Sequence, residues 1–114
     1  MSLSIKTRQV GDVTVVSCSG QITLGEATSN FRNTLRELLK TGQKKIVLDL
    51  GDVTYLDSSG IGEMVGSFTS ASSAGAGMKL ARLPKKVYDL LQITKLITVF
   101  EVFDDEATAV RSYS

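Results

Sequence analysis

The chain has 114 residues, of which 42% are hydrophobic and 22% charged, with a formal net charge of +1. This length and balance predict one globular domain, residues 1–114, and so small a net charge gives no general attraction to nucleic acid. No apolar run approaches the ~20 residues of a membrane-spanning helix, so we expect no association with a membrane.

The residue types that are missing exclude several kinds of chemistry. The chain has no histidine, which excludes Ser-His-Asp and Cys-His catalysis and removes the commonest metal ligand. Its one cysteine, Cys18, can form no internal disulfide, which suits a reducing cytoplasm, and its apolar surroundings predict a core residue. We therefore expect a cytoplasmic protein that is not an enzyme and has no catalytic residues, metal site or cofactor.

The first part of the chain predicts two strands and a helix. Apolar and polar residues alternate over residues 3–8, residues 11–12 favour a hairpin turn, and a second strand follows. Thr23 and Glu26 have the spacing of a capping box, in which a hydroxyl and a carboxylate each bind an amide at a helix start. Gly42 suits the left-handed residue that ends this helix. The helix is predicted to bury the face formed by Ala27, Phe31, Leu35, Leu38 and Leu39.

The remaining segments alternate between apolar runs and amphipathic helices. Residues 46–48 form a continuous apolar run, typical of a strand covered on both faces, and residues 51–57 are predicted to be a loop. Further short strands are expected over residues 78–81 and 99–103. Three more helices are predicted: one with Ile61, Met64, Val65, Phe68 and Ala71, one with Pro84 in its first turn and Val87, Leu90 and Leu91 on its apolar face, and one with Asp104 as N-cap before Ala107 and Val110.

The predicted elements follow the order βαβαβαβα after an N-terminal strand. Strands that alternate with helices pair in parallel, and the helices cover the sheet. The sequence therefore predicts an α/β sandwich with a mixed, mostly parallel β-sheet and about four helices.

Polar residues and glycines gather where the second of these helices begins, over residues 55–62. Unpaired amides and the helix dipole favour negative charge at such a point, so a phosphate on a serine would find donors facing it. Gly60 and Gly62 carry no side chain, so the backbone of a partner protein could approach closely. The same residues also fit a plain helix N-cap without a further role, and local chemistry leaves both interpretations open.

Residues 57–62, Asp-Ser-Ser-Gly-Ile-Gly, resemble the signature of STAS-domain anti-sigma factor antagonists. The signature is an Asp-Ser pair followed by Ser or Thr, Gly, an aliphatic residue and Gly. Other parts of the chain are similar to further segments of this family, namely residues 20–23, 46–50, 53–56 and 80–93. The resemblance covers nearly the whole chain and implies a single STAS domain over residues 1–114.

The resemblance also implies a function. Members of the family bind a cytoplasmic anti-sigma factor that is also a serine kinase, and this binding releases a sigma factor. Phosphorylation of Ser58 would switch the binding off, and a serine phosphatase would restore it. Phosphorylation adds about 1.5–2 negative charges at neutral pH, here next to Asp57 and inside the expected interface. The expected partner-binding residues are Thr23, Asp52, Asp57, Ser58, Ser59, Gly60, Ile61 and Gly62.

We expect more specific roles for three of these residues. Asp57 is expected to position the Ser58 hydroxyl, and Ser59 to cap the helix and to be a secondary phosphorylation candidate. The family often has aspartate where this chain has Thr23, so the change is either neutral or alters recognition by the kinase. An alternative function is a scaffold or regulatory STAS subunit of a stressosome-like complex. The antagonist function predicts a monomer or weak homodimer, whereas the scaffold function predicts a very large assembly.

Overall fold

A single mixed sheet organises the computed structural model, which describes residues 3–114. The five strands lie in the order β1-β2-β3-β4-β5, with β1 antiparallel to β2 and every other neighbouring pair parallel. This arrangement confirms the predicted α/β class and the mostly parallel sheet. The strands span Leu3–Val10, Val13–Ile22, Lys45–Leu56, Gly77–Ala81 and Val102–Phe103.

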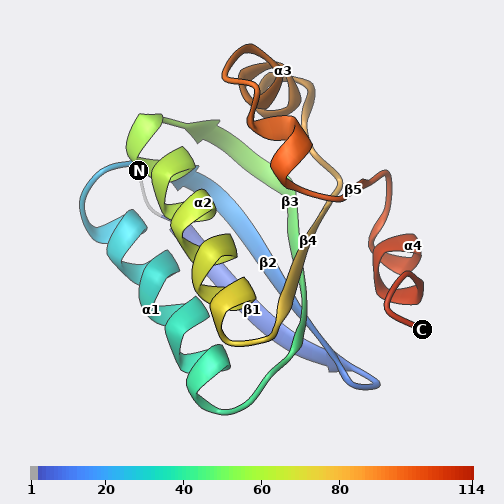
Figure 1. Cartoon of the computed structure of the whole chain (residues 1–114). Helices are drawn as coiled ribbons and strands as arrows, with labels where there is room; N and C mark the ends of the chain where they lie inside the picture. Colours follow the sequence, from blue (N-terminus) through green and yellow to red (C-terminus); the bar gives the residue numbers. More distant parts are fainter. Residues whose placement is uncertain (1–2) are drawn as a thin grey trace.

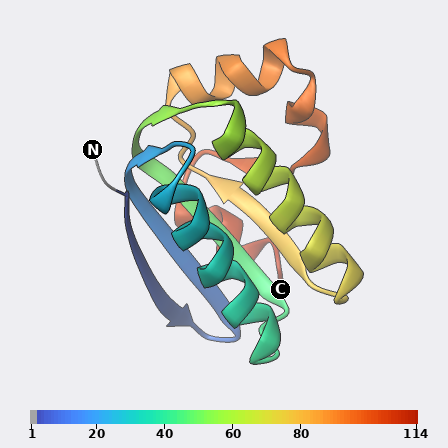
Figure 2. The same ribbon diagram turned by 90° about the vertical axis from the view of Figure 1, so that its left-hand side faces the viewer.

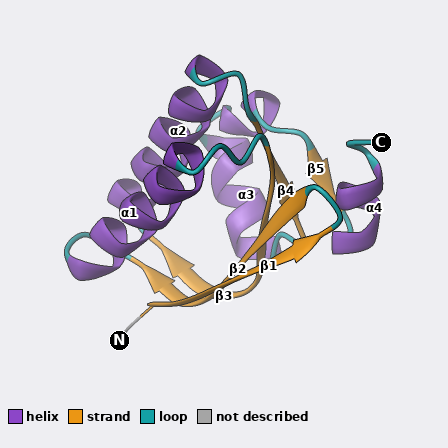
Figure 3. Ribbon diagram, turned by 90° about the horizontal axis from the view of Figure 1, so that it is seen from below, coloured by secondary structure: helices purple, strands orange, loops and turns teal. Residues whose placement is uncertain are grey.

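The helices lie on both faces of this sheet. Helices α1, α2 and α3 cover one face, with α1 and α2 side by side, and the short helix α4 covers part of the other (Figures 1, 2 and 3). Among residues 3–114, no helix is both long and apolar enough to cross a bilayer. The α-helices span Glu26–Lys40, Ser58–Ser73, Lys85–Ile93 and Glu106–Arg111, and a 3-10 helix spans Leu96–Val99.

The central strand β3 explains why the sequence has a continuous apolar run. Side chains alternate along a strand, so Ile46 and Leu48 pack beneath the three larger helices while Val47 packs against the α4 side. All three side chains are fully buried, as predicted for a strand covered on both faces. Cys18 is a core residue too, and burial raises the pKa of its thiol to about 12.

Helix ends follow the expected chemistry only in part. Gly42 has a φ of +89°, and its amide and that of Gln43 donate to carbonyls in the last turn of α1 at 3.1 and 3.0 Å. These two bonds form a Schellman motif and confirm the predicted helix stop. The predicted Thr23–Glu26 capping box is wrong. Gly25 is the N-cap of α1, and its amide donates to the Thr28 hydroxyl at 3.2 Å, because the chain first makes a turn at positive φ.

The predicted loop over residues 51–57 is also wrong, because β3 continues as a strand to Leu56. Its pairing with β2 contains two register shifts, each adding a residue to β3. Such bulges interrupt the alternation of apolar and polar residues, so this half of the strand has the composition of a loop. Its last pair, Ile22 with Leu56, fixes where the chain leaves the sheet.

Smaller corrections concern the C-terminal third. The expected strand over residues 99–103 is reduced to Val102–Phe103, because the preceding residues form the 3-10 helix. Pro84 is the N-cap of α3 and lies just before its first turn. The N-cap of α4 is Asp105, one residue beyond the predicted Asp104, and its carboxylate accepts from the Thr108 amide at 2.7 Å.

Candidate functional site at the start of helix α2

The carboxyl ends of β2 and β3 bring two distant segments together. Because these parallel strands end side by side, the loop after Ile22 meets the start of α2 at one edge of the sheet. The Asp57 amide donates to the Ile22 carbonyl at 3.4 Å, and the Leu24 amide donates to Asp57 Oδ2 at 3.0 Å. Thr23 therefore lies between two residues whose backbones both form hydrogen bonds with Asp57.

Asp57 is the N-cap of α2 and fixes the geometry of the site. Its Oδ1 accepts from the Gly60 amide at 2.8 Å while Oδ2 holds the Leu24 amide. These backbone donors, Leu24 first, lower the pKa of the Asp57 carboxyl, so a fixed negative charge stands at the helix start. The prediction that Ser59 caps the helix is wrong, because the aspartate already holds the amide that a cap would bind.

The two serines of the motif differ in their surroundings. Ser58 is the first residue of α2 and is exposed, and its hydroxyl makes no hydrogen bond with any group in residues 3–114. Ser59 is half-buried. The Ser58 side chain is therefore more accessible than that of Ser59, and no hydrogen bond within the described residues has to break before its hydroxyl can react.

The two glycines of the motif face opposite directions. A Cβ on Gly60 would lie 2.2 Å from the Ile22 carbonyl oxygen and 2.6 Å from the Leu56 side chain. Gly60 is thus required by packing inside the chain. A Cβ on Gly62 would meet nothing within 4 Å, so the fold does not need a glycine there and leaves that helix surface open. Ile61, between them, is buried in the core.

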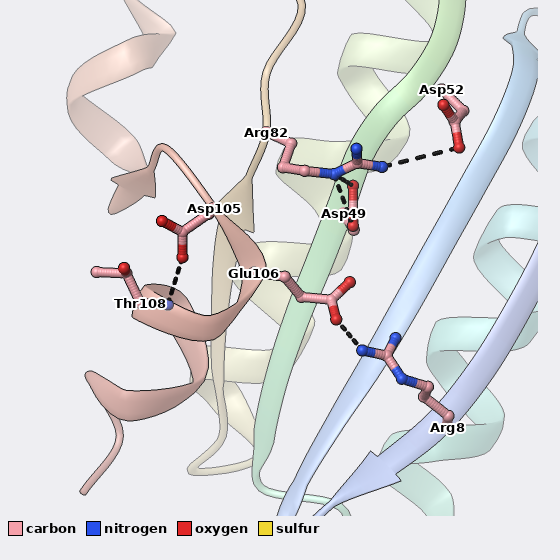
Figure 4. A network of polar contacts seen from close by, with 7 residues as sticks. All are labelled: Arg8, Asp49, Asp52, Arg82, Asp105, Glu106 and Thr108. Atoms are coloured by element: carbon pink, nitrogen blue, oxygen red, sulfur yellow. Dashed lines mark hydrogen bonds and ion pairs between the residues drawn. The ribbon is translucent and has the colours of Figure 1, made fainter.

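Asp52 does not join this cluster. It points into a second polar region, on the face of the sheet that α4 partly covers, which we call the rear groove (Figure 4). This groove has a volume of about 660 Å³. It is lined by Arg8, Ser17, Cys18, Asp49, Asp52, Arg82, Asp105, Glu106, Ala107 and Arg111.

Ion pairs within the chain satisfy most of the charge in the rear groove. Asp49 is 3% exposed, and both of its carboxylate oxygens accept from Nε of Arg82, at 3.0 and 3.1 Å. The same carboxylate accepts from the Gly51 amide at 2.9 Å, and Arg82 also reaches Asp52 at 3.7 Å. A further ion pair joins Arg8 to a glutamate of α4. Sequence reasoning missed this network because its members come from separate strands with no common motif.

Three exposed apolar side chains lie at or near the ends of β2, β3 and α3, and sequence reasoning did not single them out. Leu24 is 78% exposed although its backbone is held by Asp57, and Tyr55 is 54% exposed near the end of β3. Ile93, at the end of α3, is 78% exposed. The only available signal was position: Leu24 follows β2, Tyr55 lies next to the last residue of β3, and Ile93 ends α3.

The family comparison agrees with this geometry. The profile described as the STAS domain matches residues 4–109, and the chain belongs to the STAS domain family. The chain is 29% identical to the anti-sigma F factor antagonist of Paenibacillus polymyxa, over 96% of this chain and 94% of that protein. It is 30% identical to the anti-sigma-B factor antagonist of Listeria monocytogenes, over 90% of this chain and 88% of that protein.

Solved structures confirm the fold. An anti-sigma factor antagonist from Mycobacterium paratuberculosis superposes with a TM-score of 0.86 at 19% identity, covering 97% of this chain and 93% of that one. The Bacillus cell fate determinant SpoIIAA, solved in its phosphorylated form, gives a TM-score of 0.77 at 16% identity, covering 97% of this chain and 100% of that one. At these identities the likeness concerns the arrangement of the elements.

Proposed function

We propose that this protein is an anti-sigma factor antagonist. In this proposal it binds a cytoplasmic anti-sigma factor that is also a serine kinase, and phosphorylation of Ser58 ends the binding. One observation carries the proposal. The exposed Ser58 hydroxyl has no hydrogen-bond partner within residues 3–114, and it lies at a helix start whose capping aspartate is already held by backbone amides. The names of the curated relatives favour this function over a stressosome-like scaffold.

The partner surface is centred on the first turns of α2. Ser58 and Gly62 are four residues apart, so they lie one above the other on the same helix face. Both are exposed, and the absence of a side chain at Gly62 lets a partner's backbone come against the helix. Leu24 adds exposed apolar area beside them and is held there by Asp57.

A phosphate on Ser58 would place charge where the site is already negative. The lowered pKa of Asp57 keeps that carboxylate ionised at neutral pH, and the phosphate adds about 1.5–2 further charges next to it. The free protein can solvate this charge, but a packed interface cannot. Each ~1.4 kcal/mol of repulsion and desolvation lowers the affinity tenfold.

Thr23 bears on recognition by the kinase more than on the fold. Thr23 is half-buried beside Asp57, and its hydroxyl is not needed as a helix cap, since Gly25 is the N-cap of α1. The change from the family's usual aspartate therefore removes a charge from the partner surface. We expect Thr23→Asp to change the rate of phosphorylation more than the affinity for the kinase.

The proposal is tested with the purified serine-kinase anti-sigma factor of the source organism. Ser58→Asp should weaken the complex about tenfold to a hundredfold in titration calorimetry, equivalent to ~1.4–2.8 kcal/mol. Ser70→Asp is the matched control, because it places the same charge at an exposed position of the same helix, three turns away. With ATP present, Ser58→Ala should abolish incorporation of phosphate while Ser59→Ala retains it.

Equal affinity of the wild type and Ser58→Asp would contradict the switch. Phosphate on Ser59 instead of Ser58 would contradict the choice of residue. No complex with the wild type would contradict the antagonist function itself, and a very large assembly of the protein alone would favour the scaffold.

A further inference from the structure

Strand β3 is much longer than the neighbour on its β4 side. Strand β4 pairs with it only from Lys45 to Asp49, and within residues 3–114 no strand covers residues 50–56 on that side. The backbone N–H and C=O groups of a strand point alternately to its two sides. Those of this stretch that point away from β2 therefore form a free strand edge, which faces helix α3 (Figure 1).

A groove runs between this free edge and α3, and we call it the β3–α3 groove. Its volume is about 380 Å³, and apolar surface dominates its walls. It is lined by Thr54, Tyr55 and Leu56 of β3 and by Lys86, Val87, Asp89, Leu90 and Ile93 of α3. Such a combination of unpaired strand edge and apolar wall suits an extended peptide better than a helix.

The charge and the exposed side chains of the groove indicate the chemistry of the segment that would bind there. Ile93 and Tyr55 stand 78% and 54% exposed at its sides, ready to pack against an apolar residue. Asp89 is paired with Lys85 at 2.8 Å, whereas no carboxylate in the described residues lies within ion-pair distance of Lys86. An occupant with an apolar residue next to an acidic one would therefore complement both features.

We propose that the β3–α3 groove binds an extended segment of the anti-sigma factor kinase, which rests on the function proposed above. The segment adds as a strand to the free edge of β3 over Thr54–Leu56. It places an apolar side chain against Ile93 and an acidic side chain beside Lys86. The main-chain bonds supply affinity, and the two side chains supply selectivity.

The groove is continuous with the phosphorylation site. The Thr54–Leu56 edge is followed directly by Asp57 and Ser58, so a segment seated on that edge ends beside the Ser58 hydroxyl. One partner chain can then cover both surfaces. A phosphate on Ser58 would act on a partner that is already anchored in the groove.

A second copy of this chain fits the groove less well. Its long free strand edge is β1, and the exposed polar residues there include Lys6 but no acidic residue. Pairing β1 with the groove would bring that lysine toward Lys86, and like charges across an interface oppose association. The charge pattern thus favours a different, acidic segment.

The experiment combines binding and amide hydrogen exchange with the same purified kinase. Ile93→Lys should weaken the complex about tenfold or more, as expected for a buried interface anchor. The fold should tolerate it, since a basic residue suits a helix C-terminus. Val10→Lys is the matched control, because it replaces an exposed apolar residue at the far hairpin with the same side chain. Those amides of Thr54–Leu56 that point away from β2 should become protected only in the complex.

Each outcome decides the proposal. Protection of Thr54–Leu56 together with a selective loss of affinity in Ile93→Lys supports it. A Ser58-dependent complex without that protection, and with wild-type affinity in Ile93→Lys, overturns the groove and leaves the proposed function standing. No complex with wild type overturns both. Protection in the free protein that rises with its concentration assigns the groove to a second copy and also overturns the proposal.

Discussion

Two polar regions lie on opposite faces of the same sheet, and they differ in how their charges are satisfied. In the rear groove, Asp49 is buried and takes three hydrogen bonds, two from Arg82 and one from a backbone amide. At the start of α2, the capping carboxylate of Asp57 is held, but the adjacent Ser58 hydroxyl has no partner among the described residues. The rear groove is the larger and more charged of the two regions, yet its buried carboxylate already has its hydrogen-bond partners within the chain.

This difference distinguishes a structural polar cluster from a binding site. Side chains that already have partners lose as much as they gain when a ligand arrives, because their existing bonds must break first. An exposed hydroxyl and a glycine surface with nothing packed on it carry no such cost. Substitutions in each region can test this contrast.

The largest effect is expected inside the motif itself. Gly60→Ala places a Cβ against the Ile22 carbonyl, so we expect a loss of stability at the upper end of the ~1–3 kcal/mol that overpacking costs. Urea unfolding measures it. Gly62→Ala is the matched variant on the same helix, where open space and better helix propensity predict a gain of about 0.5–1 kcal/mol.

Binding should change in the opposite sense at Gly62. The added methyl group stabilises the helix but keeps a partner's backbone away, so Gly62→Ala should weaken the kinase complex severalfold while raising the unfolding midpoint. Stronger or unchanged binding would remove Gly62 from the partner surface. Equal stability of the two variants would contradict the difference in packing on which the comparison depends.

The rear groove should respond in stability and not in binding. Asp49→Ala leaves the Gly51 amide without its acceptor and Arg82 with only the exposed Asp52, which predicts a loss of about 1–3 kcal/mol in urea unfolding. Asp52→Ala, the control, removes an exposed carboxylate and should cost less than ~1 kcal/mol. Weaker kinase binding by Asp52→Ala would return this residue to the partner surface that the sequence predicts.

The sequence predicted the fold class because hydrophobic period and element order are local properties. The sequence-based prediction was wrong where a backbone turn or strand pairing overrode a local sequence rule. Thr23 has the spacing of a cap, yet the chain turns through Gly25 before the helix begins. Residues 51–57 have loop composition, yet strand pairing with β2 extends over most of them, with bulges that absorb the irregular pattern.

At the candidate site too, the sequence motif could not predict which residues pack inside the chain and which face outward. The motif identified Ser58 correctly as a residue at a helix start, but it could not tell the buried Gly60 from the open Gly62, since both have the same side chain. It could not place Leu24 beside Asp57 either, because that contact joins residues 33 positions apart. Only three-dimensional packing separates residues that hold the site from residues that face outward.

A pH experiment compares the capping aspartates of the two faces. Backbone hydrogen bonds lower the pKa of Asp57 and of Asp105 below the ordinary value of 3.8, with the Leu24 and Thr108 amides as the first donors. Each carboxylate therefore contributes stability that is complete above that value and is lost as the pH falls through the lowered folded pKa. Asp57→Asn and Asp105→Asn should both flatten the fall in stability below about pH 3.8.

Binding separates the two caps at neutral pH. Asp57→Asn removes a charge beside Ser58 and should alter both kinase affinity and the rate of phosphorylation, whereas Asp105→Asn should alter neither. Urea unfolding across the acid range and calorimetry at neutral pH provide the two readouts. An effect of Asp105→Asn on binding as large as that of Asp57→Asn would mean that the α4 face also contacts the partner.

The smallest effects concern one ion pair on each face. Arg8 pairs with Glu106 in the rear groove, with side chains 53% and 23% exposed, and Arg32 pairs with Glu63 between α1 and α2, with side chains 40% and 21% exposed. Double-mutant cycles to alanine should give only a small coupling for each pair, lower at high salt. The Arg32 pair should be the stronger, because its guanidinium reaches both oxygens of Glu63 through Nε and Nη2. A salt-independent coupling for Arg8 and Glu106 would contradict the solvent exposure of this pair in the rear groove.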